Sequence, residues 1–217
     1  SFVAGNRSGL IFEDEEVLGY FPRKEELGGR DFSLEQELKD CAKIVARIRE
    51  QADDHALAST FREKALARLK DEGRDFHDEK TMRLAVGRER KLWTTIQLTQ
   101  AGMERAKHWG WPNTYTYTKA LGEQVIASSP GLRYAIVRPS IVESALHYPF
   151  PGWNDGFTTS APICFACLKG QRALPASDKA VLDMIPVDMV AGSLIAITAQ
   201  QLRTSERRVY AQASGDT

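Results

Sequence analysis

Tyr115 and Lys119 stand four residues apart in the stretch PNTYTYTKALG, which begins a predicted helix. Residues with this spacing lie on the same face of a helix, about 6 Å apart. An ammonium that close to a phenol favours the ionised phenolate, so the tyrosine could exchange protons near neutral pH and act as a general acid. The lysine keeps donors for a sugar hydroxyl. The pair is therefore suited to protonating the oxyanion that forms when a hydride attacks a carbonyl.

The pair alone is weak evidence, because a chain with six tyrosines contains one such pair by chance roughly one time in three. Support comes from the apolar segment YAIVRPS that follows the helix and reads as a buried strand ending at Pro139. Ligands of open α/β sheets bind at the carboxyl ends of such strands. The loop PSIVES would then border a cofactor, and the aromatic stretch HYPFPGW could wall an apolar pocket.

Composition excludes several other classes of protein. The 29 acidic and 29 basic residues cancel, which leaves no broad positive field for nucleic acid. Three cysteines argue against a secreted disulfide framework. Cys164 and Cys167 have redox or metal spacing but no second pair, so we interpret them as part of a buried helix turn and expect no metal site. The longest apolar run, VAGSLIAITA, is shorter than the about 20 residues that span a bilayer.

Three regions position these residues: 1–32, 33–107 and 108–217. The first is mostly loop, with a strand expected around Phe2–Val3. The second is charged and helical, and we expect an antiparallel helical insertion packed on its own domain in preference to a coiled-coil dimer handle. Its predicted features are a capping box at Ser33 and Gln36, a stripe of Leu34, Leu38, Cys41, Val45 and Ile48, a helix ending near Gly73, and a helix over 80–107 whose apolar face is Leu92, Ile96, Thr99 and Met103.

The third region alternates helices with strands, which predicts an α/β fold with a largely parallel sheet. The Trp109–Trp111 stretch is expected to pack where the long helix meets the next one. Asp188 is placed to cap a helix. The expected elements are helices over 113–127, 161–169 and 189–202, strands in LRYAIVRP and RRVYAQAS, and a short strand or turn in VLDMIPVDMV.

Several motifs together resemble the fatty acyl-CoA reductases, the male-sterility branch of the extended short-chain dehydrogenase/reductases. The motifs are SFVAGNRSG, NTYTYTKALGE, VRPSIVESA, PFPGWND, IPVDMVAGS and VYAQASGDT. The resemblance covers the start of the chain and nearly all of 108–217, and it is weakest over 33–107. It implies the C-terminal part of a Rossmann-like extended short-chain dehydrogenase/reductase domain with a helical insertion.

The resemblance also implies roles. Tyr115 would be the general acid, and Lys119 would hold the nicotinamide ribose. NADPH would reduce a long-chain acyl-CoA to the aldehyde and onward to the alcohol in a cytoplasmic enzyme, with peripheral membrane contact left open. The implied cofactor-binding residues are Tyr115, Lys119, Arg138, Pro139, Ser140, Ile141 and Val142, and the implied substrate pocket is Pro149, Phe150, Pro151, Gly152 and Trp153.

Two departures from the family accompany the resemblance. Neither GNRSG nor LGGRD has the spacing of a dinucleotide-binding glycine loop. The family's catalytic serine should precede Ser1, which we do not assign. We therefore expect that the remainder of the polypeptide completes the domain and that this piece alone is inactive. Alternatives are a sugar-nucleotide epimerase or dehydratase, a hydroxysteroid-type dehydrogenase, or a non-catalytic helical interaction module.

Overall fold

A computed structural model describes residues 4–5, 11–29, 31–157, 159–173, 182–204 and 206–213. The expected strand around Phe2–Val3 lies outside these residues. The chain forms two compact units, and each is described by itself. The helical unit comprises Phe2–Asn6 and Gly19–Gly122, and the sheet unit comprises Ser1, Arg7–Leu18 and Glu123–Thr217.

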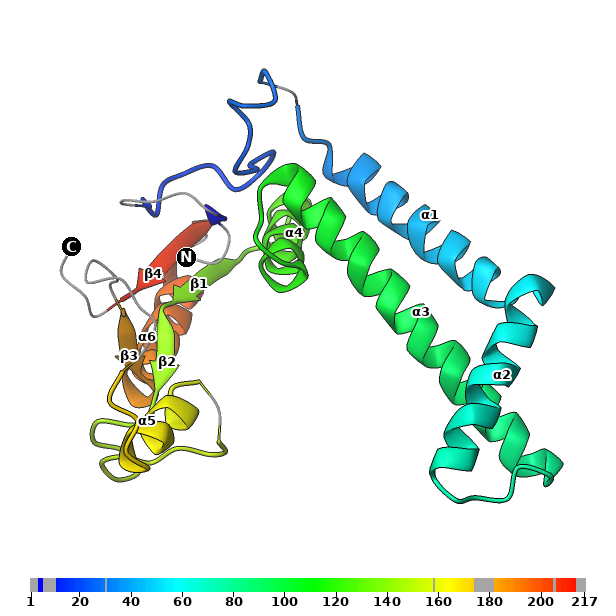
Figure 1. The fold of residues 1–217 in the computed structure, drawn as a ribbon. Coiled ribbons are helices and arrows are strands. Elements are labelled where there is room, and N and C mark those ends of the chain that lie inside the picture. The colour runs from blue at the N-terminus through cyan, green and yellow to red at the C-terminus, as the bar shows by residue number, and fades with distance from the viewer. Residues whose placement is uncertain are drawn as a thin grey trace. The chain divides into compact units, whose positions relative to one another are not determined.

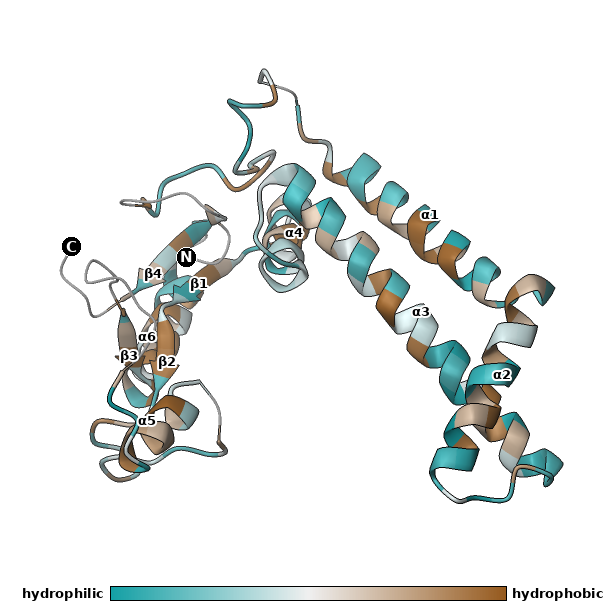
Figure 2. Ribbon diagram, in the orientation of Figure 1, coloured by the Kyte–Doolittle hydropathy of each residue, from teal (hydrophilic) through white to brown (hydrophobic). Residues whose placement is uncertain are grey.

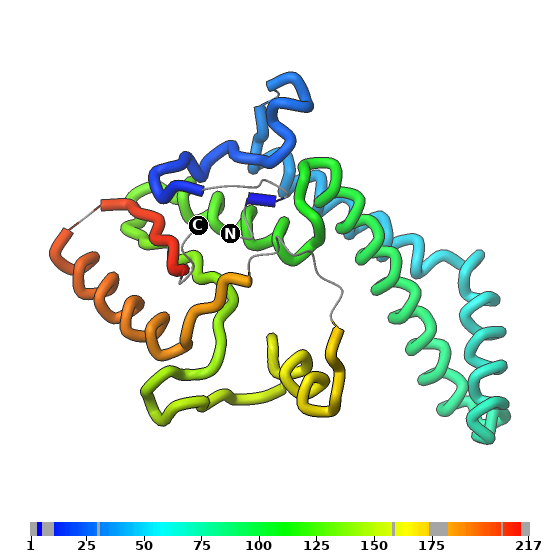
Figure 3. The backbone as a smooth tube through the Cα atoms, turned by 60° about the vertical axis from the view of Figure 1, so that its left-hand side comes forward, coloured from blue at the N-terminus to red at the C-terminus, as the bar shows by residue number. Residues whose placement is uncertain are grey.

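The helical unit contains three long helices, α1 (Leu34–Ala52), α2 (His55–Asp71) and α3 (Glu79–Trp109), and the first part of α4 (Thr114–Ser128). α1 and α3 run side by side, as Figures 1 and 3 both show. A capping side chain begins each helix, because the first backbone N–H groups of a helix have no partner within it. The caps are Ser33, which accepts from Gln36 at 3.3 Å, Asp54 from Ala56 at 3.0 Å, Asp78 from Thr81 at 2.9 Å and Asn113 from Thr116 at 2.9 Å.

The main buried cluster of the helical unit lies where α3 turns into α4, apart from a smaller one of Ala65, Leu69 and Met82. Gly110 ends α3 with a φ of 102°, a left-handed conformation that suits glycine. The N–H of Trp111 then donates to the carbonyl of Ala106 at 2.9 Å, and the Trp111 side chain is fully buried. The prediction that the 109–111 stretch packs at this turn is confirmed. The buried cluster is Phe21, Phe32, Ala106, Trp111, Tyr117, Ala120 and Leu121.

The predicted helices exist, but the predicted apolar face of α3 is wrong. On α3, Leu92 and Ile96 are 44% and 45% exposed, because the buried contacts of this helix come from Met82, Glu89 and Ala106. On α1 the predicted stripe is confirmed except at Leu38, which is exposed: Ile48 is buried, and Leu34 and Cys41 pack against the buried cluster. Figure 2 shows hydrophilic residues along much of α1, α2 and α3.

The sheet unit contains two pairs of parallel strands. β1 (Ala135–Pro139) pairs with β4 (Arg208–Gln212), and β2 (Ile141–Glu143) pairs with β3 (Met184–Pro186). The chain passes from one pair to the other at Ser140, whose N–H donates to the carbonyl of Gln212 at 2.7 Å. Parallel strands beside helices confirm an α/β architecture for this unit.

Two further helices belong to the sheet unit, α5 (Ala161–Leu168) and α6 (Val187–Arg203). α6 packs against β1, β2 and β3. α5 is apolar (Figure 2), yet none of its residues is buried. Cys164 and Cys167 are both exposed, so the prediction that they form a buried helix turn is wrong. Across the described parts of the chain, no helix is both long and apolar enough to cross a membrane.

Candidate functional site

Tyr115 and Lys119 lie on the exposed face of α4. The ammonium of Lys119 stands over the ring of Tyr115, 5.7 Å from its centroid. The Tyr115 side chain is 54% exposed, and Lys119 is exposed as well. The helix therefore brings the cation and the phenol together on a surface that a ligand can reach.

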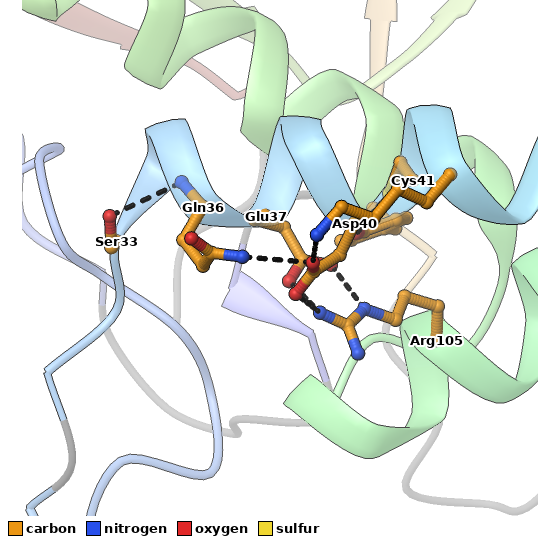
Figure 4. A network of polar contacts seen from close by, with 8 residues as sticks. Ser33, Gln36, Glu37, Asp40, Cys41 and Arg105 are labelled. Atoms are coloured by element: carbon orange, nitrogen blue, oxygen red, sulfur yellow. Dashed lines mark hydrogen bonds and ion pairs between the residues drawn. The ribbon is translucent and has the colours of Figure 1, made fainter.

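The opposite face of α4 is fixed by a buried polar network. Tyr117, two residues beyond Tyr115, is 3% exposed, and its hydroxyl donates to Oε1 of Glu37 on α1. Cys41 Sγ lies 3.4 Å from the same hydroxyl. Arg105 on α3 donates to the Glu37 carboxylate through two nitrogens (Figure 4). Three helices thus share one carboxylate, and this sets the rotation of α4 that turns Tyr115 and Lys119 outward.

The network also holds its members in defined protonation states. Burial, with the hydrogen bonds to Cys41 and Glu37, raises the pKa of Tyr117 far above its usual value, so this phenol stays neutral. Burial likewise raises the pKa of the Cys41 thiol, which makes it a poor nucleophile. The hydrogen bond to Glu37 raises the pKa of Arg105. Tyr117 is thus buried and held neutral, whereas Tyr115, two residues earlier on the same helix, is exposed to solvent.

Arg138 to Val142 form the passage from β1 to β2 in the sheet unit. The guanidinium of Arg138 is paired with Glu123 of α4, with Nε 3.1 Å from each carboxylate oxygen and Nη2 2.6 Å from Oε2. Ser140 Oγ is buried and has no hydrogen-bond partner among the described residues. The side-chain amide of Gln212, on the neighbouring strand β4, also lacks a partner among the described residues, so this strand end carries polar groups that a bound group could satisfy. Pro139, Ile141 and Val142 are partly exposed beside it.

The loop from Pro149 to Trp153 lies on the surface of the sheet unit. Phe150 is 59% exposed and Trp153 is 37% exposed. The loop is closed at its base, where the N–H of Ala145 donates to the carbonyl of Trp153 at 2.9 Å and the N–H of Gly152 donates to the carbonyl of Ala145 at 2.8 Å. Exposed aromatic side chains on a closed loop can contact an apolar ligand.

Asp188 does not cap α6, so this prediction is wrong. The helix begins at Val187, with Pro186 in the cap position. The Asp188 carboxylate accepts hydrogen bonds from backbone N–H groups at the start of the aromatic loop, which we define as residues 146–153. These bonds lower the pKa of Asp188 well below its usual value. An acidic residue at the start of a helix suggested only the cap, since nothing local in the sequence points to partners about 40 positions away.

Sequence reasoning missed three residues that shape the site. Glu37 and Arg105 hold α4 from one side, and Glu123 holds Arg138. Glu37 lies in a charged stretch of the sequence that predicts only a solvated helix face. The available signal was the position of Tyr117 two residues after Tyr115, because a helix turns it to the other face, where a phenol that is buried usually has a hydrogen-bond partner.

Known proteins are similar to this chain over up to 90% of its length. The model of the male sterility protein family matches residues 58–194. An alcohol-forming fatty acyl-CoA reductase of Simmondsia chinensis is 30% identical over 202 residues, which cover 90% of this chain and 32% of that protein. Fatty acyl-CoA reductase 8 of Arabidopsis thaliana is 43% identical over 108 residues, 49% of this chain and 22% of that protein.

A human protein is similar to a shorter part of this chain than the two plant proteins are. Fatty acyl-CoA reductase 2 of Homo sapiens is 49% identical over 89 residues, 40% of this chain and 17% of that protein. The matches to these three relatives thus span between 17% and 32% of the relatives' own lengths.

Proposed function

This chain belongs to the male sterility protein family, and from that premise we propose that it contributes the proton-donating half of a fatty acyl-CoA reductase active site. The family is a nicotinamide-binding one with a Rossmann-like α/β fold. The relatives are named fatty acyl-CoA reductases, and this supports an oxidoreductase. The finer proposal is that NADPH is the reductant and that a long-chain acyl thioester is reduced to the aldehyde and then to the alcohol.

The observation that carries this proposal is the stacked pair on α4, Lys119 over Tyr115, within the residues that match the family. The relatives' names support an acyl-CoA substrate over a sugar nucleotide or a steroid. The exposed aromatic loop at Pro149–Trp153 supports it as well, since an acyl chain needs apolar contacts and a sugar nucleotide needs polar ones.

Each unit, taken by itself, has a group that suits a nicotinamide cofactor. Ser140 Oγ is a buried hydroxyl that lacks a partner among the described residues, and the exposed Lys119 ammonium can donate to a ribose hydroxyl. NADPH, when bound, supplies the hydride for each reduction. Because the Arg138 guanidinium is paired with Glu123, we assign the backbone of 138–142 to the cofactor and the guanidinium to holding β1 against α4.

In the first reduction, hydride addition to the thioester carbonyl leaves an oxyanion on the substrate. Tyr115 donates its phenolic proton to that oxygen, and Lys119 stabilises the phenolate that results. The hemithioacetal then breaks its carbon–sulfur bond, which releases the thiol and the aldehyde. A second hydride addition produces an alkoxide at the same carbon, and Tyr115, protonated again from solvent, donates once more. One exposed phenol can thus serve both steps.

The test uses the full-length protein and follows NADPH oxidation with palmitoyl-CoA. We expect Tyr115→Phe to lower kcat by about 10²- to 10⁴-fold, the usual contribution of a positioned proton donor. Tyr134→Phe, which removes a phenolic hydroxyl from the sheet unit, is the matched control and should keep wild-type turnover. Full activity in Tyr115→Phe would reject the mechanism, and comparison of NADH with NADPH decides the cofactor.

A further inference from the structure

The carboxylate of Asp188 accepts hydrogen bonds from three consecutive backbone N–H groups. Leu146 donates to Oδ1 at 3.0 Å, and His147 and Tyr148 donate to Oδ2 at 2.8 and 3.1 Å. Three successive amides that converge on one anion form a compact anion-binding turn. Charge-assisted hydrogen bonds of this kind are about twice as strong as neutral ones. One side chain of α6 therefore fixes the backbone at the start of the aromatic loop.

The position of Asp188 on α6 favours the charged form of its side chain. It lies in the first turn, where the unpaired N–H groups and the helix dipole stabilise a negative charge. The N–H of Met189 also lies 3.2 Å from Oδ1. The carboxylate thus remains an acceptor for the loop amides throughout the neutral range, and the loop is tied to a helix that packs on β1, β2 and β3.

Side-chain packing contributes little to holding this loop. Tyr148 is 78% exposed, Phe150 is 59% exposed and Leu146 is 48% exposed. Backbone hydrogen bonds hold the loop: those to Asp188, those between Ala145, Gly152 and Trp153, and the one from the N–H of Trp153 to the carbonyl of Phe150. The aromatic side chains therefore remain available for a ligand while their Cα positions are fixed.

We propose that Asp188 is a positioning residue that holds the loop 146–153 in the form in which its apolar side chains bind the acyl chain. This proposal rests on the proposed function and extends it to substrate selection. A longer acyl chain offers more apolar surface to Tyr148, Phe150 and Trp153, so the anchored loop favours long-chain over short-chain thioesters. Without the anchor, the ordering of the loop must occur on binding, and its cost falls mainly on the long-chain substrate.

The experiment compares Asp188→Asn and Asp188→Ala with the wild-type full-length protein. Asn keeps one acceptor oxygen and Ala keeps none, so the effects should grow in that order. Asp155→Asn is the matched control, because it removes a carboxylate from the residues just after the same loop without removing a loop hydrogen bond that the structure shows. Circular dichroism and thermal unfolding establish that each variant is folded.

Two readouts separate anchoring from catalysis. Amide hydrogen exchange of residues 146–148 should speed up in both Asp188 variants and stay at the wild-type rate in Asp155→Asn. The ratio of kcat/KM for palmitoyl-CoA to that for butyryl-CoA should fall by about tenfold to a hundredfold, the change expected when the apolar contacts of about one methylene group are lost. The fall should arise mainly from KM of the long-chain substrate, with kcat for the short-chain substrate close to wild type.

Three outcomes would count against different parts of the proposal. Unchanged exchange in folded Asp188→Ala would overturn the anchor, and faster exchange with an unchanged chain-length ratio would overturn its role in selection. A wild-type protein that reduces no acyl-CoA would defeat the proposed function and the selection with it, whereas the exchange data would still decide whether Asp188 holds the loop.

Discussion

Arg105 and Glu37 form a two-bonded ion pair although 68 positions separate them in the chain. Arg105 Nε donates to Glu37 Oε1 at 2.6 Å, and Nη2 donates to Oε2 (Figure 4). Glu37 is 2% exposed, whereas Arg105 is 25% exposed and also reaches Asp40 at 3.4 Å. Glu37 therefore depends on Arg105 more than Arg105 depends on Glu37, because only the Glu37 carboxylate is shielded from water.

This inequality predicts that removing Arg105 is more damaging than removing Glu37. Arg105→Met leaves a buried carboxylate without its cation and should lower the free energy of unfolding by about 4 kcal/mol. Glu37→Met should cost less, because the guanidinium can turn to Asp40 and to water, and the Tyr117 hydroxyl still has Cys41 Sγ 3.4 Å away. Denaturant unfolding measures both values. Equal costs, or a larger cost for Glu37→Met, would contradict the burial that the structure assigns to this pair.

Tyr117 predicts a loss of stability at alkaline pH. Its pKa is raised in the folded state, mainly by burial, while in the unfolded chain it ionises near the ordinary value of 10.0. Above that pH the unfolded state has released a proton that the folded state keeps, so the free energy of unfolding falls as pH rises. Tyr117→Phe should be destabilised at neutral pH but should lose less stability between neutral and alkaline pH than wild type.

Ultraviolet titration of the native protein checks the same claim. If Tyr117 stays neutral while the protein is folded, wild type and Tyr117→Phe should show the same phenolate absorbance until unfolding begins. A native titration that is smaller by one tyrosine in the variant would show that Tyr117 ionises in the folded state, and the prediction would fail.

The sequence was sufficient for features that depend on neighbouring residues. Ser33 accepts a hydrogen bond from the N–H of Gln36, as the capping pattern predicts. The Gln36 side chain, which the capping box would direct back to the Ser33 backbone, donates to Asp40. Gly73 follows the end of α2 with a φ of 63°. The spacing of Tyr115 and Lys119 likewise fixes their contact, since one helical turn brings them together.

The sequence was insufficient where partners are distant. The bonds from Glu37 to Arg105 and from Asp188 to the aromatic loop join residues far apart in the chain, and neither end has a local pattern that names the other. The predicted apolar face of α3 failed for a related reason. Periodicity identifies a stripe such as Leu92 and Ile96, but which stripe is buried depends on where the neighbouring helices lie.

Arg138 and Glu123 predict a strong coupling between α4 and β1. Their side chains are 12% and 15% exposed, so either charge alone would be largely buried without its partner. Arg138→Met should lower the free energy of unfolding by about 3 kcal/mol, and adding Glu123→Leu should recover most of that loss, because an apolar pair can replace a buried ion pair. Denaturant unfolding of the single and double variants completes the cycle. A double variant no more stable than Arg138→Met would exclude the coupling.

Asp188 predicts that the aromatic loop stays anchored well into the acidic range. The hydrogen bonds from the three loop amides lower the pKa of Asp188 below its ordinary value of 3.8, so the folded state binds this proton less readily than the unfolded chain does. The stabilisation is therefore fully present above the ordinary value and is lost only as the pH falls through the lower folded-state value. Amide protection of residues 146–148, corrected for the intrinsic exchange rate, should stay constant from neutral pH to about pH 4. Loss of that protection at a higher pH, while circular dichroism reports an intact fold, would show that the carboxylate is protonated far more easily than its three hydrogen bonds allow.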